Sequence, residues 1–200
     1  MSKLRLGSAS FVPSRRVSPV TREDRRRWDE RYASQGPAAV DAIEAPKGFA
    51  AYAGVFPTAG QALELACGQG LGSCWLARRG LQVLGLDISP VAIRQARDLA
   101  RRIGVDDRCR FDVVDLDAGL PAGSPVDVIL CHKFRDHRLD RAIIERLAPG
   151  GLLAIAVLSE VDASPGSFRA AAGELPAAFA ELEVVAAGEG EGHAWLLARA

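Results

Sequence analysis

The sequence feature that most constrains the fold is a regular alternation of short apolar segments and amphipathic segments that starts after Gly60. Residues 126–131 and 152–158 are almost continuously apolar, which is typical of parallel strands covered by helices on both faces. In the segment between two strands, Ser89 is placed to cap a helix whose first residue is Pro90. Repeated strand–helix–strand units predict an α/β protein with an open, doubly wound, Rossmann-like sheet.

We expect a sheet of about seven strands, most of them parallel. The last two strands form an antiparallel C-terminal hairpin, because the turn over residues 188–192 is too short for a parallel connection. The expected strands cover residues 62–66, 81–86, 109–114, 126–131, 152–158, 181–187 and 194–198. Helices are expected over residues 21–33, 71–79, 90–103 and 139–147.

The chain divides into three expected parts: a flexible basic tail (1–19), an N-terminal helical lid segment (20–58) and the sheet domain (59–200). The net charge is zero, with 25 basic and 25 acidic residues, so the chain lacks the strongly basic character of many nucleic-acid-binding proteins. No apolar run is long enough to span a membrane, and the arginine-rich start does not resemble a secretory signal. We therefore expect a cytoplasmic protein with a small-molecule partner, no membrane association and no nucleic acid. The oligomeric state stays open.

The four cysteines contain no Cys-x-x-Cys pair and have no cluster of histidines beside them, so we expect neither a metal site nor a disulfide framework.

Three acidic residues follow strands at the same expected edge of the sheet, where open α/β sheets bind their ligands. Glu64 precedes a glycine-rich bend, whose exposed N–H groups suit a carboxylate or phosphate. Asp87 ends the second strand, where a carboxylate can accept hydrogen bonds from both hydroxyls of a ribose. Asp115 ends the third strand beside Leu116, a pair that suits an adenine amine and ring. Together these residues predict a site for an adenosine that carries an amine.

These motifs resemble those of class I S-adenosylmethionine-dependent methyltransferases over about residues 59–200. Residues 64–70 resemble the family's first motif, Asp/Glu-x-Gly-x-Gly-x-Gly, with Ala66 in the place of the first glycine. Residues 147–151 match the family's Leu-x-Pro-Gly-Gly turn. Residues 28–32 are similar to the Trp-x-x-Arg-Tyr helix of small-molecule branches, such as the tellurite-resistance and thiopurine methyltransferase types.

The resemblance implies that S-adenosylmethionine is the cofactor and S-adenosylhomocysteine the product. Within the family pattern, Asp87 matches the ribose-binding acid, and Asp115 with Leu116 matches the pair that contacts adenine. The cofactor-binding residues expected from the motifs and their positions are Glu64, Ala66, Gly68, Gly70, Asp87, Ile88, Asp115, Leu116 and Cys131.

Methyl transfer from a sulfonium is an in-line displacement, so the protein mainly has to hold the acceptor and the methyl group about 3 Å apart. His132 lies just past the fourth strand and is the best-placed general base, followed by His137, although a structural role stays open for a lone histidine. Lys133 and Arg135 are either ligands for an acidic substrate or solvated loop charges.

Aromatic residues from the lid segment and the loop over residues 159–173 are expected to line the acceptor pocket. The substrate-binding candidates are Trp28, Tyr32, Phe134, Phe168 and Arg169, with Phe49 and Phe56 as further lining residues. For Trp28 and Tyr32, the alternative is that they only pack the helix onto the sheet. Trp75 and Trp195 lie within regular elements and are expected in the core.

Three other functions stay open at this stage: a nucleic-acid methyltransferase that uses the basic arm, a non-catalytic S-adenosylmethionine-binding protein, and a nicotinamide-dependent enzyme. The last fits poorly, because Ser73 stands where a Gly-x-Gly-x-x-Gly motif would end.

Overall fold

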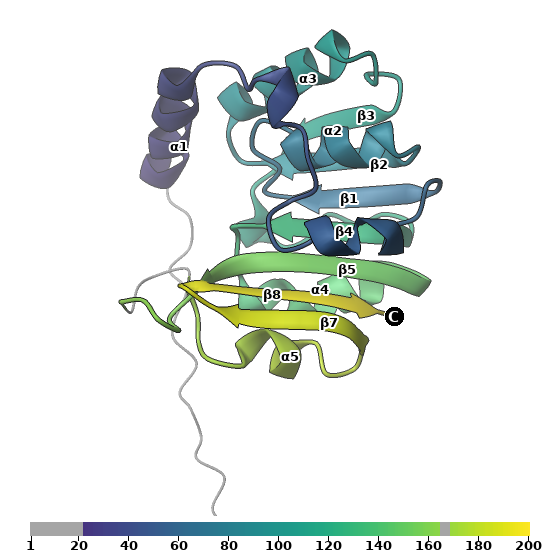
Figure 1. Cartoon of the computed structure of the whole chain (residues 1–200). Coiled ribbons are helices and arrows are strands. Elements are labelled where there is room, and N and C mark those ends of the chain that lie inside the picture. The colour runs from purple at the N-terminus through teal and green to yellow at the C-terminus, as the bar shows by residue number, and fades with distance from the viewer. Residues whose placement is uncertain (1–21, 165–168) are drawn as a thin grey trace, which may run out of the picture.

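The alternation of strands and helices after Gly60 is present in the computed structural model, which describes residues 22–164 and 169–200 (Figure 1). One sheet has the strand order β3-β2-β1-β4-β5-β8-β7, and the short strand β6 also pairs with β5. Strands β1 to β5 are parallel, whereas β8 runs antiparallel to both β5 and β7. The strands are β1 (Gln61–Leu65), β2 (Gln82–Asp87), β3 (Cys109–Val113), β4 (Val126–His132), β5 (Leu147–Ser159), β6 (Arg169–Ala170), β7 (Glu183–Gly190) and β8 (His193–Arg199).

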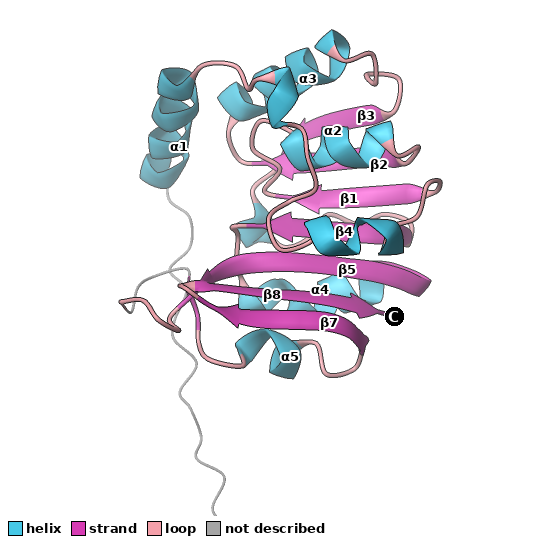
Figure 2. Ribbon diagram, in the orientation of Figure 1, coloured by secondary structure: helices cyan, strands magenta, loops and turns pink. Residues whose placement is uncertain are grey.

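Helices cover both faces of the sheet (Figure 2). The α-helices are α1 (Arg22–Gln35), α2 (Leu71–Arg78), α3 (Pro90–Arg102), α4 (Asp140–Arg146) and α5 (Glu174–Ala178). Four short 3-10 helices are η1 (Val40–Ala42), η2 (Ala50–Val55), η3 (Leu116–Ala118) and η4 (His137–Leu139). The α3 helix begins as expected: Pro90 is its first residue, and the Ser89 hydroxyl accepts a 3.1 Å hydrogen bond from the Ala92 N–H.

Two hydrophobic clusters form the core, one on each face of the sheet. The first packs α2 and α3, with Phe49 and Phe56, against side chains such as Val83 and Val128. The second packs α4 and α5 against side chains such as Leu65 and Ile129. A sheet buried on both faces explains why its central strands are continuously apolar.

The mostly parallel sheet and its antiparallel C-terminal hairpin confirm the expected architecture, but three details differ. Strands β7 and β8 extend to Gly190 and His193, so the turn is shorter than residues 188–192. Strand β5 begins at Leu147 rather than at Leu152, because Leu147 already pairs with Val126 before a shift in register. The segment expected as a loop over residues 159–173 contains β6, and the short α5 follows it.

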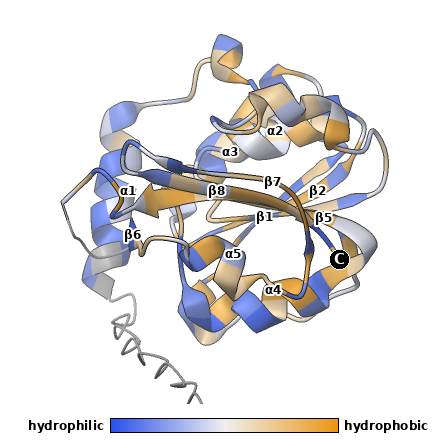
Figure 3. Ribbon diagram, turned by 60° about the horizontal axis from the view of Figure 1, so that its bottom comes forward, coloured by the Kyte–Doolittle hydropathy of each residue, from blue (hydrophilic) through white to orange (hydrophobic). Residues whose placement is uncertain are grey.

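The α1 helix differs from the rest of the molecule in position and polarity. It lies beyond the ends of the parallel strands (Figure 1), and it is strongly hydrophilic (Figure 3). Among the described residues, no helix combines the length and apolar character needed to cross a membrane. The tail over residues 1–19 lies outside the described residues.

Candidate active site

The candidate site lies where the strand order reverses, between β1 and β4. Strands β1, β2 and β3 follow one another toward one edge of the sheet, and β4, β5, β8 and β7 extend toward the other. Ligands of open α/β sheets bind at such a reversal, beyond the carboxyl ends of the strands. His132 ends β4 and therefore lies at the boundary between the two halves of this edge.

The loop after β1 is a tight backbone cradle. Gly68 and Gly70 have φ angles of 52° and 78°, and Ala66 has a φ of 51°, which is uncommon for a residue with a side chain. A Cβ on Gly70 would lie 2.8 Å from the Ala96 Cβ and 3.1 Å from the Phe111 ring. The glycine is therefore required by both its conformation and its close packing.

Glu64 is a buried carboxyl beneath this cradle. It is 4% exposed, and it accepts a short hydrogen bond from the Ser73 hydroxyl on α2. Burial, with a smaller contribution from the nearby Asp87 carboxylate, raises the pKa of Glu64 to about 7 against the lowering effect of the Ser73 hydrogen bonds. Sequence reasoning gave Ser73 no role, although it lies nine residues from Glu64, where a helix following the strand could bring the two together.

Asp87 connects the ends of β1 and β2. Its Oδ2 accepts a 2.8 Å hydrogen bond from the Gly68 N–H, and its Oδ1 accepts a 2.8 Å hydrogen bond from the Ser89 N–H. Burial is the main influence on this carboxyl and raises its pKa, while the backbone hydrogen bonds counteract that rise. Each carboxylate oxygen has a second lone pair, so Asp87 can also accept hydrogen bonds from two ribose hydroxyls.

The third acidic residue is less enclosed. Asp115 is exposed, and its carboxylate accepts a 3.0 Å hydrogen bond from the Asp117 N–H at the start of η3. Leu116 is buried in the second hydrophobic cluster, whereas Ile88 is half-buried. Of Asp115 and Leu116, Asp115 therefore has the more accessible side chain for an adenine amine.

The α1 helix reaches this cradle through Tyr32. The Tyr32 hydroxyl lies 2.8 Å from the position that a Cβ on Gly68 would take. Burial and the Asp87 carboxylate raise the pKa of Tyr32, so its hydroxyl stays protonated and can donate a hydrogen bond. Trp28 packs against Tyr32 with its ring centroid 6.0 Å away.

Three polar contacts that the sequence does not predict hold α1 and the segment after it against the cradle and the start of α3. The Ser89 hydroxyl donates a hydrogen bond to the Asp29 carboxylate. The Gln95 side-chain amide donates to the Tyr32 carbonyl at 3.0 Å, and the Gln69 amide donates to the Gly36 carbonyl at 2.6 Å. Because Gln69 belongs to the cradle itself, the lid and the cradle form one assembly.

A glycine cradle with buried carboxyls on two sides fits the cofactor that the sequence motifs imply. The positive-φ glycines allow backbone approach, Asp87 offers lone pairs at the place expected for a ribose, and Glu64 is a carboxyl whose charged form a cationic ligand would favour. The residues present therefore agree with adenosine and amine recognition.

The other half of the edge holds a cleft of about 590 Å³. Its floor follows a row of paired residues across four strands: His132, Ala156, Trp195 and Gly188. His132 is half-buried, and burial first, then the charges of Lys133 and His193, lowers its pKa to about 4. His132 is therefore uncharged at neutral pH.

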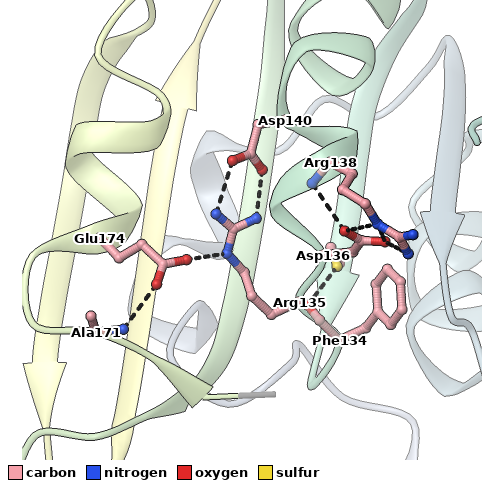
Figure 4. A network of polar contacts seen from close by, with 8 residues as sticks. Phe134, Arg135, Asp136, Arg138, Asp140, Ala171 and Glu174 are labelled. Carbon is pink, nitrogen blue, oxygen red and sulfur yellow. Dashed lines mark hydrogen bonds and ion pairs between the residues drawn. The ribbon is translucent and has the colours of Figure 1, made fainter. Parts of the chain in front are cut away.

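A buried ionic network supports the loop that follows His132 (Figure 4). Arg135 donates two hydrogen bonds to Asp140, at 2.5 and 2.9 Å, and one to Glu174 at 2.7 Å. Glu174 also accepts a 2.9 Å hydrogen bond from the Ala171 N–H, so the loop after β4 is tied to the start of α5. The expectation for Arg135 was wrong: it is buried and paired, so it is neither a solvated loop charge nor available to a substrate.

Other expected pocket residues have structural contacts. Phe49 and Phe56 are core residues, since they are 0% and 2% exposed and pack edge-on against Trp195 and Trp75. The Arg169 guanidinium donates to the carbonyls of Ser159 and Gly192 and so holds the hairpin tip.

The remaining candidates lie near the end of β4 or outside the described residues. The buried Cys131 thiol donates to the Phe134 carbonyl at 3.2 Å, and the Phe134 ring packs on the second hydrophobic cluster. His137 is exposed on η4. Phe168 lies outside the described residues.

Trp75 and Trp195 both pack against the first hydrophobic cluster, which confirms their expected place in the core. Trp195 has a second role that the sequence did not reveal, because it also lines the cleft.

Comparisons with known proteins agree with this geometry. Residues 62–151 match a model described as a methyltransferase domain. Over 100 residues the chain is 37% identical to methyltransferase GfsG of Streptomyces halstedii, a match that covers 47% of this chain and 36% of the relative. Over 120 residues it is 33% identical to the ubiquinone biosynthesis O-methyltransferase of Xanthomonas axonopodis pv. citri, covering 58% of this chain and 48% of the relative. The matches therefore span less than half of these curated relatives.

The fold extends beyond the segment matched in sequence. The crystal structure of the [4+2]-cyclase SpnF superposes with a TM-score of 0.69 at 19% identity, covering 92% of this chain and 97% of that one. At this level of identity the likeness concerns the fold alone. Residues 62–151 therefore resemble a methyltransferase domain in sequence, in agreement with the motifs that resemble those of class I S-adenosylmethionine-dependent methyltransferases, and the solved structure adds agreement in fold.

Proposed function

We propose that the chain transfers a methyl group from S-adenosylmethionine to a small-molecule acceptor held in the cleft beside His132. The observation that carries this proposal is the position of His132. It ends β4, between the strand that leads into the glycine cradle and the strands that form the cleft floor. A group at that boundary can face a donor on one side and an acceptor on the other.

The residues on the cradle side would hold the donor. Asp87 would accept hydrogen bonds from the ribose hydroxyls, Glu64 would favour the positive charge of the ligand, and Tyr32 on α1 would close the cradle. When bound, S-adenosylmethionine supplies a methyl group on a positively charged sulfur, which leaves with the electron pair of the carbon–sulfur bond as S-adenosylhomocysteine.

The residues on the cleft side would orient the acceptor and receive its proton. His132 is uncharged at neutral pH, so one ring nitrogen can accept a hydrogen bond from an acceptor hydroxyl. As the acceptor oxygen forms its bond to carbon, the hydroxyl proton passes to that nitrogen and then to water. The cradle and the lid hold the donor side still while this happens, so that the main contribution of the protein is alignment.

The test is a screen of thiols, phenols, carboxylates and amines with saturating donor, with release of S-adenosylhomocysteine as the signal. We expect turnover with one acceptor class, and His132→Gln should lower that turnover with little change in donor affinity. Normal turnover by this variant would show that His132 is not the base.

The same assay separates the other functions. Donor binding with no turnover on any acceptor would favour a binding protein of this fold over an enzyme. Nucleic-acid binding that weakens steeply with salt would favour a nucleic-acid substrate.

A further inference from the structure

Lysine is rare in this chain, and its positions are informative. Only three of the 25 basic residues are lysines, and Lys3 lies outside the described residues. The other two, Lys47 and Lys133, come from segments 86 positions apart and line the same cleft. Two of the three histidines, His132 and His193, line it as well.

Both lysines are exposed, and among the described residues no carboxylate lies within 4.0 Å of either ammonium group. Glu189 also lines the cleft, but its carboxylate accepts hydrogen bonds from the Ser159 hydroxyl at 2.9 Å and the Gly173 N–H at 3.0 Å. Glu191 lines the cleft as well, and it is exposed at the tip of the hairpin. The cleft therefore has two ammonium groups without a carboxylate partner on the described chain.

An aromatic side chain, Trp195, also lines the cleft. The Trp195 indole is half-buried and held by Phe49, at a ring distance of 6.1 Å and an angle of 88°, and by Tyr52 at 5.4 Å. Gly188 and Gly48 lie against it: a Cβ at these positions would be 2.5 Å from the indole Nε1 and 3.3 Å from Cγ. Because both are glycines, no side chain from these positions covers the ring.

We propose that the acceptor is a small planar molecule that carries an anionic group, a carboxylate or a phosphate. Its ring would stack on the Trp195 indole, its anionic group would lie between Lys47 and Lys133, and its reacting hydroxyl would face His132. That this molecule is the methyl acceptor rests on the proposed function, but its binding can be measured without donor and without turnover.

The pKa of His132 is a second measure of anion binding. Lys133, and His193 after it, contribute electrostatically to the low pKa of this histidine, although burial is the larger cause. An anion placed near these charges opposes them, so its binding should raise the pKa of His132.

The experiment follows the His132 imidazole and the Trp195 indole of the full chain by NMR during titration with four probes. The probes are 4-hydroxybenzoate, phenyl phosphate, the neutral 4-hydroxybenzamide and the non-planar cyclohexanecarboxylate. We expect the planar anions to shift both signals and to bind about tenfold tighter than the amide or the non-planar acid. The phosphate and benzoate arms show which anionic group the cleft prefers.

Variants identify the contribution of the lysines. Lys133→Gln and Lys47→Gln should each weaken binding of the preferred anion by roughly three- to tenfold, and the double variant more. Arg141→Gln is the matched control, because Arg141 is exposed on α4 and outside the cleft. Its binding should equal that of the wild type.

Equal binding of the benzoate and the amide, or unchanged binding in both lysine variants, would overturn the anionic part of the proposal. Equal binding of the benzoate and the non-planar acid would overturn the planar part. Anion binding without any methyl transfer would leave this inference standing and would contradict the proposed function instead.

Discussion

The two halves of the ligand edge are built in different ways. At the ends of β1, β2 and β3, the site consists of backbone in unusual conformations and of carboxyls buried beneath it, such as Glu64 and Asp87. At the ends of β4, β5 and β7 and the start of β8, it consists of side chains that line a cleft, such as Lys133 and Trp195. The first half suits one fixed ligand, whereas the second can change its chemistry by substitution of single side chains.

The difference follows from what each half has to recognise. Backbone conformation is fixed by a few glycines and by close packing, so it holds one shape firmly. A cleft lined by lysine, histidine and tryptophan derives its selectivity from charge and ring contacts, which leave the fold unchanged. We therefore expect substitutions in the first half to alter donor binding or stability, and most substitutions in the second to alter acceptor choice.

The largest expected effect is a loss of stability caused by a residue beside the cleft. It is an exception to the division above, which expects most changes on this side to alter acceptor choice. Arg135→Met should lower the free energy of unfolding by about 3 kcal/mol, since it leaves Asp140 and Glu174 without their buried cation. Urea unfolding would measure the loss. Arg141→Met removes two exposed ion pairs and should have no measurable effect; an equal loss in both variants would refute the role of the buried network.

On the donor side, Asp87→Ala should weaken binding of S-adenosylmethionine by roughly ten- to hundredfold, because two hydrogen bonds to the ligand are lost. Titration calorimetry would measure this change. Unchanged affinity would show that Asp87 only organises the backbone of Gly68 and Ser89. Acceptor binding in the cleft, followed by NMR, should remain as in the wild type.

A smaller loss of stability tests whether the glycine cradle depends on its backbone conformation. Gly70→Ala should lower the free energy of unfolding by about 2 kcal/mol, because alanine is strained at positive φ and would press on Ala96 and Phe111. Gly54→Ala is the control, since no atom lies within 4 Å of the Cβ it would add. Thermal unfolding that fails to distinguish the two variants would contradict the claim.

The last prediction is a difference in pH dependence between the halves. The pKa of Glu64 is raised to about 7, so folding binds a proton there and stability falls as the pH rises from about 4.5 through 7. The pKa of His132 is lowered to about 4, so stability there falls as the pH drops from its ordinary pKa of 6.5 through 4.

Urea unfolding between pH 4.5 and 6.5 would separate these two contributions. Glu64→Gln should make stability rise more steeply with pH than in the wild type, whereas His132→Gln should make it rise less steeply. Slopes that change in the same direction in both variants would contradict the assigned pKa shifts.

The glycine cradle and the carboxyls beside it were predictable from the sequence because their signals are local. Glu64, Gly68 and Asp87 lie at strand ends that periodicity locates, and Ser89 with Pro90 marks the start of the next helix. The antiparallel hairpin was predictable for the same reason, since a short turn permits no other connection. Long runs of apolar residues predicted the parallel strands.

The acceptor half was not predictable, because it depends on contacts between distant segments. The pairing of His132 with Ala156, and of Ala156 with Trp195, is a property of the strand order and register. Lys47 joins them from the lid segment, where no periodicity indicates its position. Phe49 and Phe56 look like pocket residues in a broken segment, yet the sheet buries them.

The most direct test of the central claim is calorimetric titration of the purified, ligand-free chain with S-adenosylmethionine and S-adenosylhomocysteine. The account predicts saturable binding of both at a single site, strongly weakened by Asp87→Ala and unaffected by the exposed substitution Arg141→Gln. Folded protein that releases no heat of binding with either compound would contradict it.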